Sequence, residues 1–219
     1  MMRFFSKLIL TLGALALLAS PAWAQGQGRG GFGGGAAGFL MAPNVQKDLK
    51  LTDEQVKKVQ ETLREIREKH QGDYTALRDA SPDVRSTKMA TLNETVGDEV
   101  KKALSFSAEQ SKRFDQISLQ AHGAQAFANP TVDAKLKLTD DQKSKIREIV
   151  EATRSSSAGA FNKDASEQER TDARNKRAAT QKQNMTKVQA LLTSDQKKAW
   201  KELTGEPIEI QYPARRSNN

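Results

Sequence analysis

The side chains best suited to chemistry in this chain are two histidines, His70 and His122, and a dense set of charged residues. Neither histidine has a second histidine at helical spacing, and the chain has no cysteine, so the sequence lacks the paired ligands of a tight zinc site and any thiol nucleophile. The glycine run from Gly26 has no strand before it and no Lys-Ser/Thr after it, as a phosphate-binding loop requires. We therefore expect no enzymatic activity, no catalytic residue, no metal site and no cofactor. His70 lies on an apolar stripe, and we interpret it as a packed side chain.

The charged residues favour binding over catalysis. The chain carries 35 Lys and Arg against 27 Asp and Glu, a net charge of +8. Residues 44–129 contain 14 basic and 14 acidic side chains, whereas residues 130–219 contain 18 and 13, so most of the excess lies in the second half. A basic surface attracts acidic proteins, anionic lipid or cell-wall polymers. Nucleic acid is disfavoured as a partner, because no aromatic platform alternates with the basic residues.

A five-residue motif of the form Leu-Thr-x-x-Gln indicates the elements that must position these side chains. Its first and third copies, at residues 51–55 and 138–142, start 87 residues apart, and its second and fourth, at 106–110 and 192–196, start 86 apart. This spacing predicts the tandem duplication of a unit of about 87 residues. The residues at its first, second and fifth positions are Leu51, Thr52, Gln55, Phe106, Ser107, Gln110, Leu138, Thr139, Gln142, Leu192, Thr193 and Gln196.

Each copy of the motif has the chemistry of a helix start. The Thr or Ser hydroxyl can accept a hydrogen bond from the backbone N–H three residues later, and the Gln at that position can reach back to the N–H of the capping residue. Apolar residues then recur at spacings of three and four, which predicts amphipathic helices. In the first repeat we expect one helix from Thr52 to about Asp79, and a second that starts at Ser81-Pro82. In the second repeat, Ser166 and Glu169 form a fifth capping pair.

The predicted fold class is all-α, with two tandem antiparallel helical hairpins. We assign residues 43–129 to the first repeat and residues 130–213 to the second. The two repeats either pack on each other as an intramolecular pseudo-dimer or form an extended array. Sparse aromatic residues and dense charge favour a thin helical layer over a sheet or a thick core.

The N-terminus has the composition of an export signal. Arg3 and Lys7 precede an apolar run at residues 8–19, and Ala22-Trp23-Ala24 is a small-x-small cleavage site. We predict that residues 1–24 are a signal peptide removed after Ala24, which makes the mature protein periplasmic. The apolar run is too short to span a bilayer, so we expect no stable membrane insertion.

Two further segments complete the predicted organisation. Residues 25–42 are rich in glycine and are expected to form a flexible linker, and residues 214–219 a disordered tail. Near the end, Gly205 and Pro207 indicate a helix stop, after which Ile208, Ile210 and Tyr212 are expected to pack back as a short extended strap.

Signal peptide, helical pattern, basic charge and paired motifs together resemble the Spy/CpxP family of periplasmic stress proteins, whose superfamily includes zinc-associated ZraP-like relatives. The resemblance rests on the four motif copies and covers roughly residues 43–205. It implies thin, curved helical hairpins that dimerise into a cradle and hold unfolded proteins without ATP on a basic, partly apolar concave face. Because one chain here contains both motif pairs, we expect either a monomer with pseudo-dimeric repeats or a homodimer.

The resemblance and the charge pattern make a holdase for unfolded envelope proteins the leading hypothesis. Apolar residues that recur at helical spacing could bind clients, but they could equally form the buried seam of a hairpin. A metal-binding stress sensor is an alternative class, and so is a non-enzymatic adaptor that binds an envelope sensor domain. The candidate client-binding residues are Val59, Leu63, Ile66, Tyr74, Arg170, Arg174 and Arg177.

Overall fold

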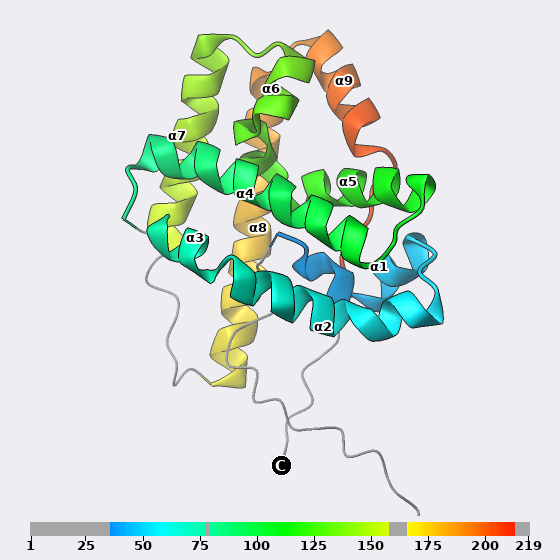
Figure 1. Cartoon of the computed structure of the whole chain (residues 1–219). Coiled ribbons are helices and arrows are strands. Elements are labelled where there is room, and N and C mark those ends of the chain that lie inside the picture. Colours follow the sequence, from blue (N-terminus) through cyan, green and yellow to red (C-terminus); the bar gives the residue numbers. More distant parts are fainter. Residues whose placement is uncertain (1–35, 78, 158–165, 213–219) are drawn as a thin grey trace, which may run out of the picture. The chain divides into compact units, whose positions relative to one another are not determined.

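The apolar spacing of the sequence produces helices along the described part of the chain (Figure 1). The computed structural model describes residues 36–77, 79–157 and 166–212, in which no strand occurs. The all-α fold class is therefore confirmed. The α-helices are α1 (Pro43–Asp48), α2 (Asp53–Lys69), α3 (Gln71–Ala76), α4 (Pro82–Ala103), α5 (Ala108–His122), α6 (Pro130–Leu136), α7 (Asp140–Ser157), α8 (Glu167–Leu191) and α9 (Ser194–Thr204), with 3-10 helices η2 (Gly38–Met41) and η3 (Gly123–Ala128).

Every copy of the Leu-Thr-x-x-Gln motif begins a helix, as predicted. In all four, the Thr or Ser hydroxyl accepts from the Gln backbone N–H at 3.2 Å, and the Gln side chain accepts from the capping residue's N–H at 2.9–3.0 Å. Ser166 and Glu169 form the same box at the start of α8. Ser81 precedes Pro82 at the start of α4, but its side chain makes no capping hydrogen bond. The motif thus fixes the first turns of α2, α5, α7 and α9.

The described residues build two hydrophobic clusters, each around an aromatic side chain at an equivalent position of the repeat. In the first cluster, Phe114 of α5 packs against Phe39 of η2 with ring centroids 5.1 Å apart. In the second, Trp200 of α9 stacks on Phe127 of η3 at 4.3 Å. Each cluster therefore takes an aromatic ring from a 3-10 turn that precedes a proline-initiated helix, α1 or α6.

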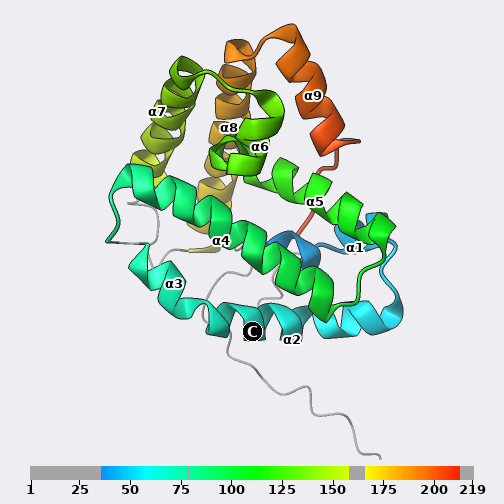
Figure 2. The ribbon, with the colours of Figure 1, turned by 45° about the horizontal axis from the view of Figure 1, so that its top comes forward.

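The helices of the two halves contact one another. Within the first half α2 contacts α4, and within the second half α7 contacts α8. Between the halves α5 contacts α9, α4 contacts α6, and η3 contacts α7 and α8. Figures 1 and 2 both show α7 beside α8. All described residues belong to one compact unit.

Two predicted boundaries are wrong. The helix expected to run from Thr52 to about Asp79 ends at Lys69, and α3 begins after a break at His70, whose ring is held by side chains of α3 and α4. The segment expected to be a flexible linker up to residue 42 is packed from Ala36 onward, because Phe39 and Leu40 are almost fully buried in the first cluster. The globular part therefore starts earlier than Pro43.

Several predictions concern residues that the structure does not describe. They are the signal peptide and its cleavage site, most of the glycine-rich segment, and the tail after Tyr212. Among the described helices, none is long and apolar enough to cross a membrane.

Candidate functional site

The glutamines of the motif do more than cap their own helices, because the two motifs of each half meet. In the second half, Nε2 of Gln142 donates to Oε1 of Gln196 at 2.7 Å, and Nε2 of Gln196 donates to Oε1 of Gln142 at 2.9 Å. Both side chains are buried. This reciprocal amide pair joins the N-termini of α7 and α9.

The same amide nitrogens also bind backbone carbonyls at the ends of other helices. Nε2 of Gln142 donates to the carbonyl of Leu191, the last residue of α8, at 2.8 Å. Nε2 of Gln196 donates to the carbonyl of Leu136, the last residue of α6, at 3.3 Å. Carbonyls at a helix C-terminus lack partners within their own helix, so each glutamine satisfies the end of one helix and the start of another.

The first half repeats this arrangement. Gln55 and Gln110 exchange side-chain hydrogen bonds of 3.2 and 3.0 Å, and their Nε2 atoms donate to the carbonyls of Leu104 and Lys50. We call each pair, Gln55 with Gln110 and Gln142 with Gln196, a glutamine clasp. The sequence predicted the caps but missed the clasps; the paired occurrence of the motif within each repeat was the signal that could have revealed them.

The apolar residues proposed as client contacts lie in the core. Val59, Leu63 and Ile66 are buried in the first cluster, where a client cannot reach them in this structure. Tyr74 is half-buried and packs against the same cluster. The burial of the three aliphatic residues agrees with the alternative interpretation, a buried seam. The cause is their helical period, because α2 turns that stripe toward α4. Tyr74 is only partly covered and stays a predicted client contact.

The proposed basic cluster lies on α8. Arg177 is exposed there, whereas the side chains of Arg170 and Arg174 lie outside the described part of the structure. Residues 175–179 and 181–183 are all exposed, in agreement with the polar composition of this part of the helix.

A different surface lies nearer the C-terminal end of α8, where α7 and α8 form a shallow, open groove. Its apolar lining comes from Ile149 and Ala152 on α7 and from Ala190 and Leu191 on α8. Three charged residues, Lys145, Glu148 and Lys187, complete the lining. The lining is thus largely apolar, and its charged residues sum to +1, although Nζ of Lys145 also pairs with Oδ2 of Asp141 at 2.8 Å.

His70 is buried, as predicted, and lies between two carboxylates. Its Nδ1 is 2.7 Å from Oδ2 of Asp73 on α3, and its Nε2 is 3.2 Å from Oε2 of Glu99 on α4. The hydrogen bond with Asp73, aided by Glu99, raises the pKa of His70 above its ordinary value despite the opposing effect of burial. Lys69 also bonds Glu99, and this contact lowers the pKa of Glu99. The cluster therefore stabilises a protonated imidazole at the break between α2 and α3.

His122 lies in the opposite electrostatic environment. Its Nδ1 is 2.6 Å from the carbonyl oxygen of Ser118 and 3.3 Å from the hydroxyl oxygen of the same residue. Removal of the ring from water lowers the pKa of His122.

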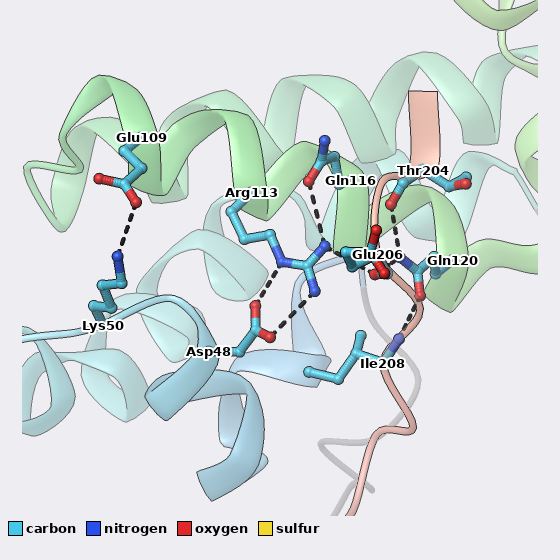
Figure 3. Close-up of polar contacts among 9 residues, drawn as sticks. All are labelled: Asp48, Lys50, Glu109, Arg113, Gln116, Gln120, Thr204, Glu206 and Ile208. Atoms are coloured by element: carbon cyan, nitrogen blue, oxygen red, sulfur yellow. Dashed lines mark hydrogen bonds and ion pairs between the residues drawn. The ribbon is translucent and has the colours of Figure 1, made fainter. Parts of the chain in front are cut away.

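A polar cluster on α5 links the first half to the C-terminal segment (Figure 3). Arg113 binds both carboxylate oxygens of Asp48, the last residue of α1, and its Nη1 donates to the carbonyl of Glu206 at 2.9 Å. Beside it, Lys50 pairs with Glu109 at 2.9 Å. The segment after α9 is thus held on the first repeat, with Ile208 and Ile210 packed against the first cluster as predicted. Tyr212 was expected to pack with them but is exposed.

In the described residues, no group of three or more His, Asp or Glu side chains is arranged to hold a metal ion. No family model, no curated protein and no solved structure matches this chain.

Proposed function

We propose that this chain is an ATP-independent holdase that binds unfolded proteins after export to the periplasm, with the groove between α7 and α8 as its client-binding surface. The observation that carries the proposal is the groove's composition. Ile149, Ala152, Ala190 and Leu191 offer apolar contact in an open site, and none of them is fully buried. An exposed apolar surface of this kind favours weak contact with apolar segments of many chains.

Charge supports the choice of client. Lys145 and Lys187 line the groove, Arg177 is exposed on the same helix α8, and the second half carries most of the excess positive charge. Positive charge near a binding surface speeds the encounter with acidic chains more than it strengthens the final complex. We therefore expect capture of acidic clients to be faster than capture of basic ones, and to slow as salt increases.

We also infer that the two halves act as an intramolecular pseudo-dimer of helical hairpins, in the manner of the two-chain cradle of the family that the chain resembles. Two glutamine clasps, two clusters and the contact between α5 and α9 support this inference. Light scattering behind a sizing column should then give a monomer. An obligate dimer would contradict a self-contained pseudo-dimer.

The experiment that tests the function is suppression of aggregation of a chemically denatured reporter protein, without ATP, by the purified chain lacking residues 1–24. We expect light scattering to fall at near-stoichiometric ratios. The variant Ala190→Glu, which places a carboxylate in the groove, should weaken suppression.

Ala178→Glu is the matched control, since Ala178 is exposed on the same helix and does not line the groove. It makes the same change of charge and should retain full suppression. Absence of suppression by the unaltered chain across acidic, neutral and basic reporters would contradict the proposal.

A further inference from the structure

The C-terminal segment is held on the first repeat through its main chain. Oε1 of Gln120 accepts a hydrogen bond from the backbone N–H of Ile208 at 2.9 Å. Nε2 of the same side chain donates to the carbonyls of Thr204 at 2.7 Å and Glu206 at 2.9 Å (Figure 3). One glutamine of α5 therefore forms hydrogen bonds with both a backbone N–H and backbone carbonyls of the segment.

A second amide repeats this recognition farther along the segment. Nδ2 of Asn44 on α1 donates to the carbonyl of Glu209 at 2.7 Å, and Oδ1 of Asn44 accepts from the backbone N–H of Gln211 at 3.1 Å. Arg113 adds its bond to the carbonyl of Glu206. None of these contacts involves a side chain of the segment, so they carry no sequence requirement beyond an N–H at the two donor positions.

The side chains of the segment follow a period of two. Ile208 and Ile210 are partly buried against the first hydrophobic cluster, whereas Glu209 and Gln211 are exposed. Alternation of this kind is the pattern of an extended peptide lying on a surface. The surface thus selects for apolar residues at every second position and for an extended backbone.

We propose that this surface, formed by Asn44, Gln120, Arg113 and the adjoining part of the first cluster, is a second binding site for an extended, alternately apolar segment of an unfolded polypeptide. In this structure residues 206–212 of the chain itself occupy it. The inference rests on the proposed function for the class of ligand, but it concerns a different surface. Recognition of main-chain atoms by fixed amides suits a ligand whose sequence varies.

We expect the resident segment to exchange with a competing peptide, because the contacts described above are replaceable by those of another extended backbone. Residues 205–212 belong to no helix or strand, and Tyr212 at the end of the described residues is 47% exposed. A covalently attached segment nevertheless competes at high effective concentration. Foreign segments therefore bind measurably only when the resident segment is weakened or the competing peptide is concentrated.

The test uses a fluorescein-labelled peptide with the sequence of residues 206–212, and fluorescence anisotropy as the readout. In the full chain, the double substitution Ile208→Asp with Ile210→Asp weakens the resident segment. We expect this variant to bind the probe at least about tenfold more tightly than the unaltered chain does. A peptide in which both isoleucines are aspartate should not bind.

Adding Asn44→Ala or Gln120→Ala to the loosened chain should weaken probe binding by about fivefold to tenfold, as expected for the loss of hydrogen bonds to the peptide backbone. Asn175→Ala is the matched control, because Asn175 is exposed on α8 and its substitution should leave binding unchanged. If the loosened chain loses its helical circular dichroism, the unaltered chain is titrated with concentrated probe instead. The side-chain amide NMR signals of Asn44 and Gln120 should then shift.

Absence of probe binding, or binding that neither Asn44→Ala nor Gln120→Ala weakens, would overturn the proposal. So would a loosened chain that forms dimers by light scattering without binding probe, because the surface would then serve a second copy. The peptide assay involves no aggregating client. Loss of aggregation suppression with intact probe binding would therefore contradict the proposed function alone, and the reverse result would contradict only this second site.

Discussion

The side-chain amides of Gln142 and Gln196 form a closed pair, in which each donates to the other and each also donates to a carbonyl at the end of a further helix. Each glutamine is the last residue of a Leu-Thr-x-x-Gln motif, and the two glutamines are 54 residues apart in the sequence. The glutamine of the motif therefore caps its own helix and also forms hydrogen bonds with residues distant in sequence. Because the pair is buried, each amide depends on its partner for satisfied hydrogen bonds.

The first prediction compares two positions of one motif. Gln196→Ala should lower the free energy of unfolding by about 2–3 kcal/mol, because it leaves the buried Gln142 amide and the N–H of Thr193 short of partners. Thr193→Ala removes only the cap and should cost about 1 kcal/mol. Urea denaturation measures both values. A Gln196→Ala cost no larger than that of Thr193→Ala would show that the clasp adds nothing.

The caps could be read from the sequence because a capping box is local, with both partners three residues apart. The clasps could not, because Gln55 and Gln110 meet only when α2 and α5 are placed by the packing of the first cluster. The same reasoning explains why three aliphatic residues predicted as client contacts are buried in this structure. The stripe through Val59 and Ile66 has the helical period of a core, and only the tertiary contact with α4 decides whether it is covered.

The residue at which the globular part starts could also not be predicted from local composition. Glycine-rich composition predicted a linker through residue 42, yet the few apolar residues after Gly38 are enough for Phe39 to pack on Phe114. Conversely, the strap was predicted from alternating apolar residues near the end of the chain. Its binding surface, made by Asn44 and Gln120, lies on the first repeat and has no sequence signal of its own.

The second prediction concerns the two histidines. An NMR pH titration of the ring protons should show one imidazole with a pKa above the ordinary value of about 6.5 and one below it. Asp73 and Glu99 stabilise the charged form of His70, whereas removal from water disfavours the charged form of His122. The variant His70→Asn assigns the signals. Two superposed titrations, or the reverse order, would contradict the described environments.

The third prediction concerns how the protonation of His70 changes the free energy of unfolding with pH. Because the folded-state pKa of His70 is raised, its protonation stabilises the fold fully below the unfolded-state pKa, and this contribution disappears as pH rises through the folded-state value. The difference in free energy of unfolding between the unaltered chain and His70→Asn should therefore be larger at about pH 6 than at about pH 8.5. Urea denaturation at the two pH values measures it. A difference that grows with pH would contradict the assignment.

The fourth prediction tests the turn that leads into the C-terminal segment. Gly205 has φ +61°, and a Cβ at this position would lie 2.5 Å from the Gln116 side chain. Gly205→Ala should therefore cost about 1–3 kcal/mol, since it is strained and crowds a residue next to Arg113. Thermal and urea denaturation measure this cost.

Gly72→Ala is the matched control for that substitution. Gly72 lies in α3 with no atom within 4 Å of an added Cβ, so alanine should be neutral or stabilising by about 0.5–1 kcal/mol. If both alanines had the same effect, the conformation at Gly205 would not be the cause.

The fifth prediction tests the central claim, that clients bind the groove between α7 and α8. The chain has no cysteine, so a single cysteine introduced as Ala190→Cys carries an environment-sensitive dye at one defined place in the groove. Ala178→Cys, on an exposed position of the same helix outside the groove, is its control. On addition of a permanently unfolded acidic protein, we expect the emission of the dye at position 190 to shift to the blue and that at position 178 to stay unchanged. Equal shifts at both positions, or no shift at position 190 while aggregation is suppressed, would contradict the account.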